Sequence, residues 1–424
     1  MTILLFSIFI VLMLLRVPIA ISLALSTIIV LTQIDFNLQM VPQRVFTAMD
    51  SFPLMAIPGF VLAGVILARG GISKYLIGAL RAWVGHLSGG LAVVTILACM
   101  VFAAISGSSP ATAAAIGSIM IPAMVNAGYD KKYAMGLVAA AGTLGILIPP
   151  SIPLIIYGIT AEVSIGKLFM AGIIPGVILG GVLVASAIFY AKKNNYRGGR
   201  KIPWGERGKM SLKAIWGAFL PFLILGSIYS GAATPTESAV IAVFYSIVVS
   251  VVIYRELRWK DVRPIIVESL NITSMIFLII GAASLFALYL TNAQVPQQVG
   301  EWIASSNMNK FTFFLIVNLM FFVMGTFLEA VSIILITLPI LLPVLAHMGI
   351  NPIYFAIVMT INMEMAMITP PVGLNLFVVS GISKEKLGEV VKGVTPFIAL
   401  FVLVLVLVIV FPQLSLWLPE RMDY

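Results

Sequence analysis

Residues 145–151 read Gly-Ile-Leu-Ile-Pro-Pro-Ser, and residues 366–371 read Ala-Met-Ile-Thr-Pro-Pro. Each stretch interrupts an apolar segment, because proline lacks a backbone N–H and its ring clashes with the preceding helical turn. The two Pro-Pro pairs stand 221 positions apart, and the same offset carries Gly172 onto Gly393 and Pro175 onto Pro396. The sequence therefore predicts an internal repeat in which each copy contains a discontinuous helix.

The composition around these stretches is that of a membrane protein. The 424 residues are 61% hydrophobic and 10% charged, which is more apolar surface than a water-soluble core can bury. Apolar runs long enough to cross about 30 Å of hydrocarbon recur, without the alternation of barrel strands. Because spanning segments satisfy their own backbone hydrogen bonds, we expect an all-α polytopic membrane protein.

Loop charge predicts the topology. The net charge is +9, and the densest basic loops are residues 191–213 and 255–263, which should be cytoplasmic. Two apolar spans lie between them, at about 214–231 and 236–254, and an even number of spans returns the chain to the same side. The basic residues are therefore topology signals, and lipid is the expected partner rather than nucleic acid.

Counting spans from these loops predicts two re-entrant helical hairpins. Residues 89–125 start and end on the cytoplasmic side, whereas residues 311–345 start and end on the periplasmic side. Each hairpin precedes a discontinuous helix, at 134–161 and 354–381 respectively. An odd number of crossings separates the two copies, so the repeat is inverted, as in secondary transporters that alternate access around a midplane site.

The interruptions place polar groups inside the membrane. A Pro-Pro break frees backbone carbonyls, which need a partner in protein, water or a bound cation such as sodium. The candidate sodium ligands are Ser106, Ser108, Gly145, Ile148 and Pro150 for a first site, and Gly325, Thr326, Ala366, Thr369 and Pro371 for a second. The candidate substrate-binding residues are Ser108, Ser109, Thr143, Glu329 and Asn375. The competing interpretation is that the small residues only permit close helix packing.

Two glutamates, Glu329 and Glu364, each allow a structural and a functional interpretation. Glu329 either closes a capping box with Thr326 or belongs to the site, because ionisable residues at membrane depth are functional by default. Glu364 is either a site residue or a member of a buried network. The segment from Thr234 to Glu237 is a cleaner capping box, with proline at the first helical position.

Enzymatic chemistry is not indicated. The sequence contains no Ser-His-Asp arrangement, no paired catalytic carboxylates, no P-loop and no metal-spaced cluster. The single cysteine, Cys99, cannot form an internal disulfide, and there are two histidines. We therefore expect no enzyme and no cofactor, and a transporter that draws its energy from ion gradients.

Six motifs are distinctive: residues 50–54, 104–113, 141–145, 148–153, 233–237 and 368–373. Together they resemble the motifs of one transporter family, the large membrane subunit of tripartite ATP-independent periplasmic (TRAP) transporters, called the DctM-type permease. The resemblance covers nearly the whole chain.

The resemblance implies an elevator-type ion transporter in the bacterial inner membrane, with sodium as the coupling ion. It also implies a separate small membrane subunit of four helices and a periplasmic binding protein that delivers the substrate. The implied substrates carry carboxylates, commonly sialic acids or C4-dicarboxylates. The family's sodium sites at hairpin tips and broken helices match the positions inferred above from the repeat.

The resemblance also divides the chain into scaffold and moving parts. The expected parts are N-terminal scaffold helices at 1–88, a first transport repeat at 89–170, scaffold and arm helices at 171–290, a second transport repeat at 311–392, and a C-terminal helix with a periplasmic tail at 393–424. Residues 3–31 form either one interrupted span or two short helices.

Other functions compete with this one. The nearest is a stand-alone ion-coupled carboxylate carrier that needs no binding protein. A membrane scaffold without transport activity would leave the paired hairpins unexplained, and an intramembrane enzyme is disfavoured because Asp is nearly absent from the spans.

Overall fold

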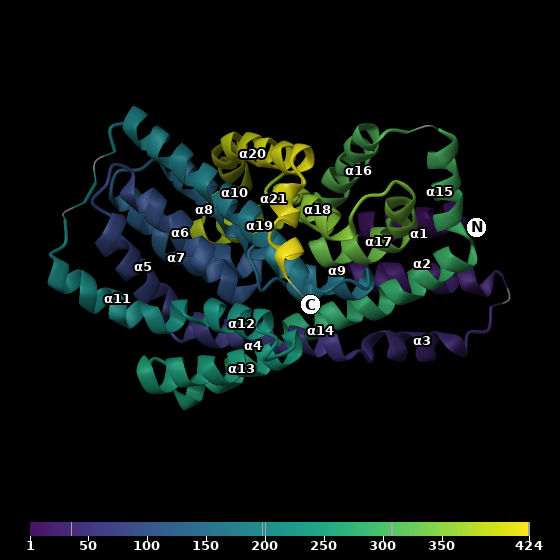
Figure 1. The fold of residues 1–424 in the computed structure, drawn as a ribbon, viewed down its shortest axis with the longest axis horizontal. Helices are drawn as coiled ribbons and strands as arrows, with labels where there is room; N and C mark the ends of the chain where they lie inside the picture. The colour runs from purple at the N-terminus through teal and green to yellow at the C-terminus, as the bar shows by residue number, and fades with distance from the viewer. Residues whose placement is uncertain (35, 197, 200, 307, 423–424) are drawn as a thin grey trace.

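The computed structural model describes residues 1–34, 36–196, 198–199, 201–306 and 308–422 (Figure 1). Arg197 and Arg200 of the basic loop, and residues 423–424 of the predicted tail, lie outside the described residues. The described residues contain helices and no strand. The helices are α1 (Thr2–Leu14), α2 (Ile19–Thr32), α3 (Met40–Met49), η1 (Phe52–Met55), α4 (Ala56–Arg69), α5 (Ile72–Val84), α6 (Gly90–Ser106), α7 (Ser109–Asn126), α8 (Lys131–Thr143), η2 (Leu144–Ile146), α9 (Ile152–Thr160), α10 (Ile165–Lys193), α11 (Trp204–Ala218), α12 (Leu220–Tyr229), α13 (Pro235–Ile247), η3 (Val248–Ile253), α14 (Trp259–Asn292), α15 (Val295–Ser305), α16 (Lys310–Gly325), α17 (Ala330–His347), α18 (Pro352–Ala366), α19 (Leu374–Ser383), α20 (Leu387–Val410), α21 (Gln413–Leu416) and η4 (Pro419–Arg421).

The all-α polytopic prediction is confirmed. Among the described residues, six helices are long and apolar enough to cross a membrane, and a seventh span results if α11 and α12, bent by 44°, are counted together. Residues 3–31 form two helices, α1 and α2, separated by a turn at Leu15–Pro18. The sequence left that choice open.

Two predicted boundaries were wrong. The basic segment 191–213 is not a loop throughout, because α11 begins at Trp204 and continues to Ala218. The predicted span at 214–231 is therefore the end of α11 followed by α12 after a bend at Phe219. Helix α11 carries charged residues in its first turns, so its composition is that of a loop although its backbone is helical.

Each pair of helices predicted as a hairpin folds back on itself. Helices α6 and α7 run antiparallel, since the Thr95 hydroxyl near the start of α6 lies 3.5 Å from the Met124 sulfur near the end of α7. Their tip is Gly107, which has φ of 59°. Helices α16 and α17 meet again at their open end, where the Lys310 ammonium donates to the Gly349 carbonyl over 3.2 Å.

Both basic loops contact α5. The Gly199 N–H donates to the carbonyl of Gly85, the C-cap of α5, over 2.9 Å, and the Asp130 N–H donates to the Tyr196 hydroxyl over 3.1 Å. Near the start of α5 the Tyr75 hydroxyl donates to Glu256, and this bond and Lys74 hold the pKa of Glu256 below its ordinary value. The placement of both loops on the cytoplasmic side stays a prediction from charge.

Helix bounds recur at the offset of 221. Adding 221 to Ser109 and Asn126, the ends of α7, gives Ala330 and His347, the ends of α17. Adding 221 to Lys131, the first residue of α8, gives the first residue of α18. The two Pro-Pro breaks therefore belong to a longer correspondence of helices.

The two halves meet where α8 packs against α20 without intervening side chains. A Cβ atom added to Gly393 would clash with the carbonyl oxygen of Lys132, and one added to Gly136 would clash with the carbonyl oxygen of Gly393. Because the neighbouring atoms are backbone, they cannot rotate away. Glycine is therefore required on both sides of this contact.

We expect Gly393→Ala to destabilise the protein by about 1–3 kcal/mol through overpacking. Gly181→Ala is the matched control, because Gly181 lies within α10 and a Cβ there meets nothing within 4 Å. Thermal unfolding of the purified variants should show a clear loss for Gly393→Ala alone. Equal unfolding temperatures would contradict the close contact.

Candidate functional site

The first hairpin tip closes over the first helix break. A Cβ atom at Gly145 would stand 2.7 Å from the Ser108 carbonyl oxygen, and one at Gly107 would stand 2.9 Å from the Pro150 carbonyl oxygen. The structure therefore brings Ser108, Gly145 and Pro150, three predicted ligands of the first sodium site, into direct contact around Gly107.

Oxygen atoms line this contact. The Ser106 hydroxyl lies 2.9 Å from the Thr112 hydroxyl, which donates to the Ser108 carbonyl over 2.8 Å. The carbonyl of Ile148 accepts no hydrogen bond from a described residue. Hydroxyl and carbonyl oxygens are the ligands that hard cations prefer. The site is thus chemically suited to a cation such as sodium.

The second break lies against the second hairpin. A Cβ atom at Gly325 would clash with the Cβ of Ala366, so these two predicted ligands are in contact. The hydroxyls of Thr326 and Thr369 each donate to a carbonyl of their own helix, over 2.8 Å and 2.7 Å. Pro371 is exposed, and no described hydrogen bond joins it or Thr369 to Thr326.

Glu237 caps a helix, whereas Glu329 and Glu364 have buried carboxyl oxygens without hydrogen-bond partners among the described residues. The capping box at Thr234 and Glu237 is confirmed. The alternative capping box at Thr326 and Glu329 is absent, because Glu329 is itself the N-cap of α17 and its Oε1 is buried without a hydrogen-bond partner among the described residues. Glu364 is fully buried and approaches the Leu147 backbone, but neither of its oxygens meets hydrogen-bond geometry.

Three of the predicted substrate residues are interior. Ser109, Thr143 and Asn375 are each 0% exposed. The Asn375 amide donates to the Ser109 hydroxyl over 2.8 Å and to the Ala139 carbonyl over 3.1 Å. The Thr143 hydroxyl donates to the Ala140 carbonyl of its own helix over 2.9 Å. The two Asn375 bonds therefore join the second broken helix to the first hairpin and to α8.

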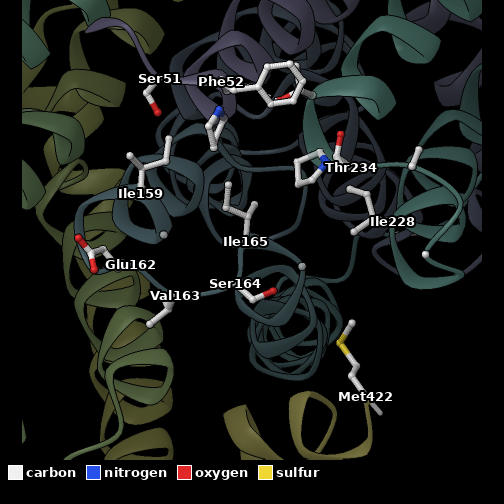
Figure 2. A pocket seen from close by; sticks show the side chains of 17 residues that line it. Ser51, Phe52, Ile159, Glu162, Val163, Ser164, Ile165, Ile228, Thr234 and Met422 are labelled. Atoms are coloured by element: carbon white, nitrogen blue, oxygen red, sulfur yellow. Dashed lines mark hydrogen bonds between the residues drawn. The ribbon is translucent and has the colours of Figure 1, made fainter. Parts of the chain in front are cut away.

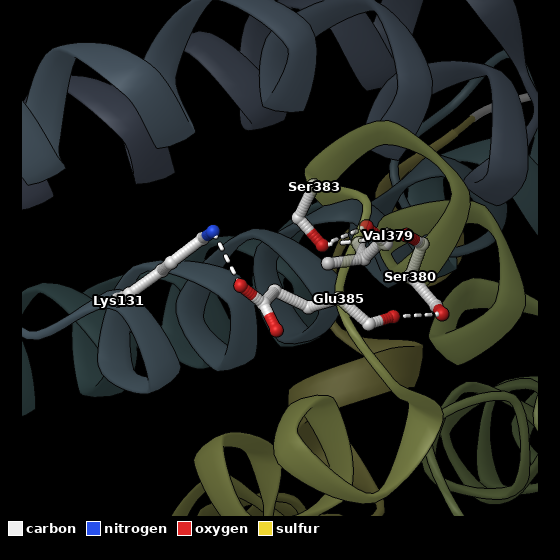
Figure 3. Close-up of polar contacts among 5 residues, drawn as sticks. All are labelled: Lys131, Val379, Ser380, Ser383 and Glu385. Atoms are coloured by element: carbon white, nitrogen blue, oxygen red, sulfur yellow. Dashed lines mark hydrogen bonds and ion pairs between the residues drawn. The ribbon is translucent and has the colours of Figure 1, made fainter.

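A second link between the halves lies at the start of α8. Figure 3 shows Lys131, the first residue of α8, reaching Glu385 after α19, and their charged atoms are 2.6 Å apart. The Ser380 hydroxyl donates to the Glu385 carbonyl over 2.6 Å and holds that turn in place. The broken helices of the two repeats are thus tied together.

One cavity reaches the second hairpin tip. It has a volume of about 540 Å³. Its walls come from the turn between α1 and α2, the middle of α14, the tip between α16 and α17, and the break between α18 and α19. Of the predicted site residues, Gly325, Thr326 and Glu329 line it, and so does Arg16. No sequence motif identifies Arg16, which stands alone between two apolar runs.

Another cavity, of about 600 Å³, lies elsewhere (Figure 2). It is bounded by the turn between α9 and α10, the turn between α12 and α13, and Met422. None of the predicted sodium or substrate residues lines it. The candidate site is therefore the set of hairpin tips and breaks, together with the cavity at the second tip.

A helical bundle of this kind, with membrane-crossing helices and polar groups collected at interrupted helices beside a cavity, defines a multi-pass membrane permease.

Residues 6–414 match the family model of the tripartite ATP-independent periplasmic transporter, DctM component. The chain is 42% identical over 377 residues to the C4-dicarboxylate TRAP transporter large permease protein DctM of Pseudomonas aeruginosa, covering 89% of this chain and 88% of that protein. It is 40% identical over 420 residues to the isethionate TRAP transporter permease protein DctMQ of Oleidesulfovibrio alaskensis, covering 97% of this chain and 65% of that protein.

The fold is similar to that in the crystal structure of the Alcanivorax borkumensis YdaH transporter, with a TM-score of 0.64 and 14% identity over 90% of this chain and 88% of that one. The chain belongs to the DctM family and is a TRAP transporter large permease, as the sequence motifs predicted. It is accordingly a multi-pass protein of the inner membrane and not an enzyme.

We expect Gly107→Ala to loosen the contact between the first hairpin tip and the first break. Gly349→Ala is the matched control, because Gly107 and Gly349 have φ of 59° and 61°, but a Cβ at Gly349 meets nothing within 4 Å. Both variants bear the cost of a left-handed alanine, about 1–2 kcal/mol. Only Gly107→Ala adds an overpacking cost of about 1–3 kcal/mol.

Thermal unfolding of the two purified variants measures the difference. A larger loss for Gly107→Ala supports the contact with Pro150. Equal losses would mean that the hairpin tip does not rest on the break.

Proposed function

We propose that this permease imports an organic anion by sodium symport. The observation that carries the proposal is the contact of the first hairpin tip with the first break, where Ser106, Ser108 and the Ile148 carbonyl offer neutral oxygen ligands. The buried Glu364 carboxyl, which approaches the neighbouring Leu147 backbone, is not one of the proposed ligands. Neutral oxygen ligands suit a monovalent cation, because a divalent ion usually requires carboxylates to balance its charge.

The second sodium ion occupies the equivalent place in the other repeat. Its ligands come from Gly325, Thr326, Ala366, Thr369 and Pro371. The contact of Gly325 with Ala366 supports this assignment. Binding at both tips fixes each hairpin on its broken helix, so cation and substrate binding are coupled through one rigid unit.

The two hairpins and the two broken helices move together as an elevator against the remaining helices. Supporting this proposal, the Ser109 to Asn375 bond, the Lys131 to Glu385 pair and the Gly136 to Gly393 contact all join elements of the two repeats. The inverted relation of the repeats gives this unit two positions related by a pseudo-two-fold axis in the membrane plane, one open to each side.

A small four-helix membrane subunit and a periplasmic substrate-binding protein complete the transporter. The DctMQ relative supports the membrane partner, because this permease covers only 65% of that protein and leaves room in it for a second subunit. The substrate belongs to the carboxylate-bearing acids, of which C4-dicarboxylates have the support of the Pseudomonas aeruginosa relative. Sialic acids are the second substrate class to test.

The test is uptake into vesicles that contain this permease and its small subunit. We expect uptake of radiolabelled succinate or sialic acid to require both the binding protein and an inward sodium gradient. Ser106→Ala should raise the sodium concentration for half-maximal uptake about tenfold, which corresponds to about 1.4 kcal/mol.

Ser118→Ala is the control, because the Ser118 hydroxyl is exposed on α7 and bonds only to the Ala115 carbonyl of the same helix. Uptake that is indifferent to sodium would refute the symport. Uptake that persists without the binding protein would favour a stand-alone carrier.

A further inference from the structure

Arg16 occupies an unusual place in this permease. It lies in the turn between the apolar helices α1 and α2, beside Met275 to Ile279 in the middle of α14. Its φ is 64°, a left-handed conformation that bulky residues rarely adopt. A glycine would fit this turn better, so an arginine here costs backbone energy without serving the turn itself.

The guanidinium of Arg16 is available for a ligand. The side chain is exposed, and it forms no ion pair or hydrogen bond with any residue that the structure describes. Arg16 lines the 540 Å³ cavity together with Thr326 and Glu329 of the second hairpin tip. A charged group beside an apolar cavity is well suited to binding an ion of opposite charge.

The charges around the cavity explain how a cation would promote anion binding. Among the described residues that line it, Arg16 and Glu329 are the ionisable ones, so an ionised Glu329 leaves the walls with no net charge. Glu329 has a buried Oε1 without a hydrogen-bond partner. A sodium ion at the adjacent tip would offset Glu329 and leave the charge of Arg16 uncompensated.

We propose that Arg16 is the anion-binding residue of this cavity and pairs with a carboxylate, or a similarly shaped oxyanion, of the transported acid. The planar guanidinium donates two parallel N–H bonds to such a group, which a lysine cannot do. The proposal rests on the proposed function, since it assigns the substrate's acidic group to a position that becomes favourable when sodium is bound.

The experiment measures acid binding by the purified complex of this permease and its small subunit. Thermal unfolding is recorded against increasing succinate, isethionate and N-acetylneuraminate, each with sodium and with potassium as the only cation. Arg16→Gly removes the guanidinium and suits the left-handed turn, so it should not impair folding. Arg255→Gly is the matched control, because Arg255 also has a positive φ, of 56°, and does not line the cavity.

We expect at least one acid to stabilise the wild-type complex in sodium and much less in potassium. Arg16→Gly should raise the half-saturating concentration of that acid about 10- to 100-fold, as for the loss of a charge-assisted hydrogen-bonded pair. Arg16→Lys should fall between the two, and Arg255→Gly should match wild type.

Two outcomes would overturn the assignment. One is equal acid affinity in Arg16→Gly and wild type. This includes the case in which Arg16→Gly only lowers the yield of membrane-inserted protein, which would mean that Arg16 sets the topology or contacts lipid. The other is the absence of any acid-dependent shift in wild type. Acid binding that depends on Arg16, combined with vesicle uptake that ignores sodium, would instead refute the symport and leave this site standing.

Discussion

The backbone polar groups at the two Pro-Pro breaks constrain the rest of this structure. A carbonyl that loses its helical partner inside an apolar bundle must find another, since no bulk water reaches it. At the first break the solution is local. The Ser151 hydroxyl donates to the Ile146 carbonyl, and Gly107 and Gly145 bring the hairpin tip within contact distance. The hairpin tip thus covers the break, and this contact is where the proposed cation site lies.

The same backbone arrangement carries different chemistry in the two repeats. At the offset of 221, Ser108 corresponds to Glu329 and Thr143 corresponds to Glu364. The first repeat therefore has hydroxyls where the second has carboxyls, although the helix bounds coincide. Both carboxyls have oxygens without hydrogen-bond partners among the described residues. A buried carboxyl oxygen without a partner is costly to retain, and this supports the proposal of a cation in the second repeat.

The sequence predicted the features that depend on local chemistry. Pro-Pro pairs and a Ser-Gly-Ser tip act through backbone geometry, so the breaks and the tips followed from residue order. Contacts between distant segments could not be predicted in this way. The bond between Asn375 and Ser109 joins residues 266 positions apart, and the buried placement of Thr143 depends on packing that no local pattern records. The place of Arg16 in a cavity also depends on distant segments, because the other walls come from residues near 275 and 326.

Asymmetry between the repeats also bears on coupling. A tip lined by neutral oxygens gains one positive charge when it binds a cation, and its attraction for an anion rises from that of a neutral site. A tip that contains a carboxyl opposite an arginine behaves differently. There the cation cancels the carboxyl, and the attraction of the remaining guanidinium for an anion grows in a space with few other charges. The proposed coupling therefore rests on the carboxyl and the arginine of the second repeat, because there the cation cancels an existing negative charge beside the proposed position of the acid.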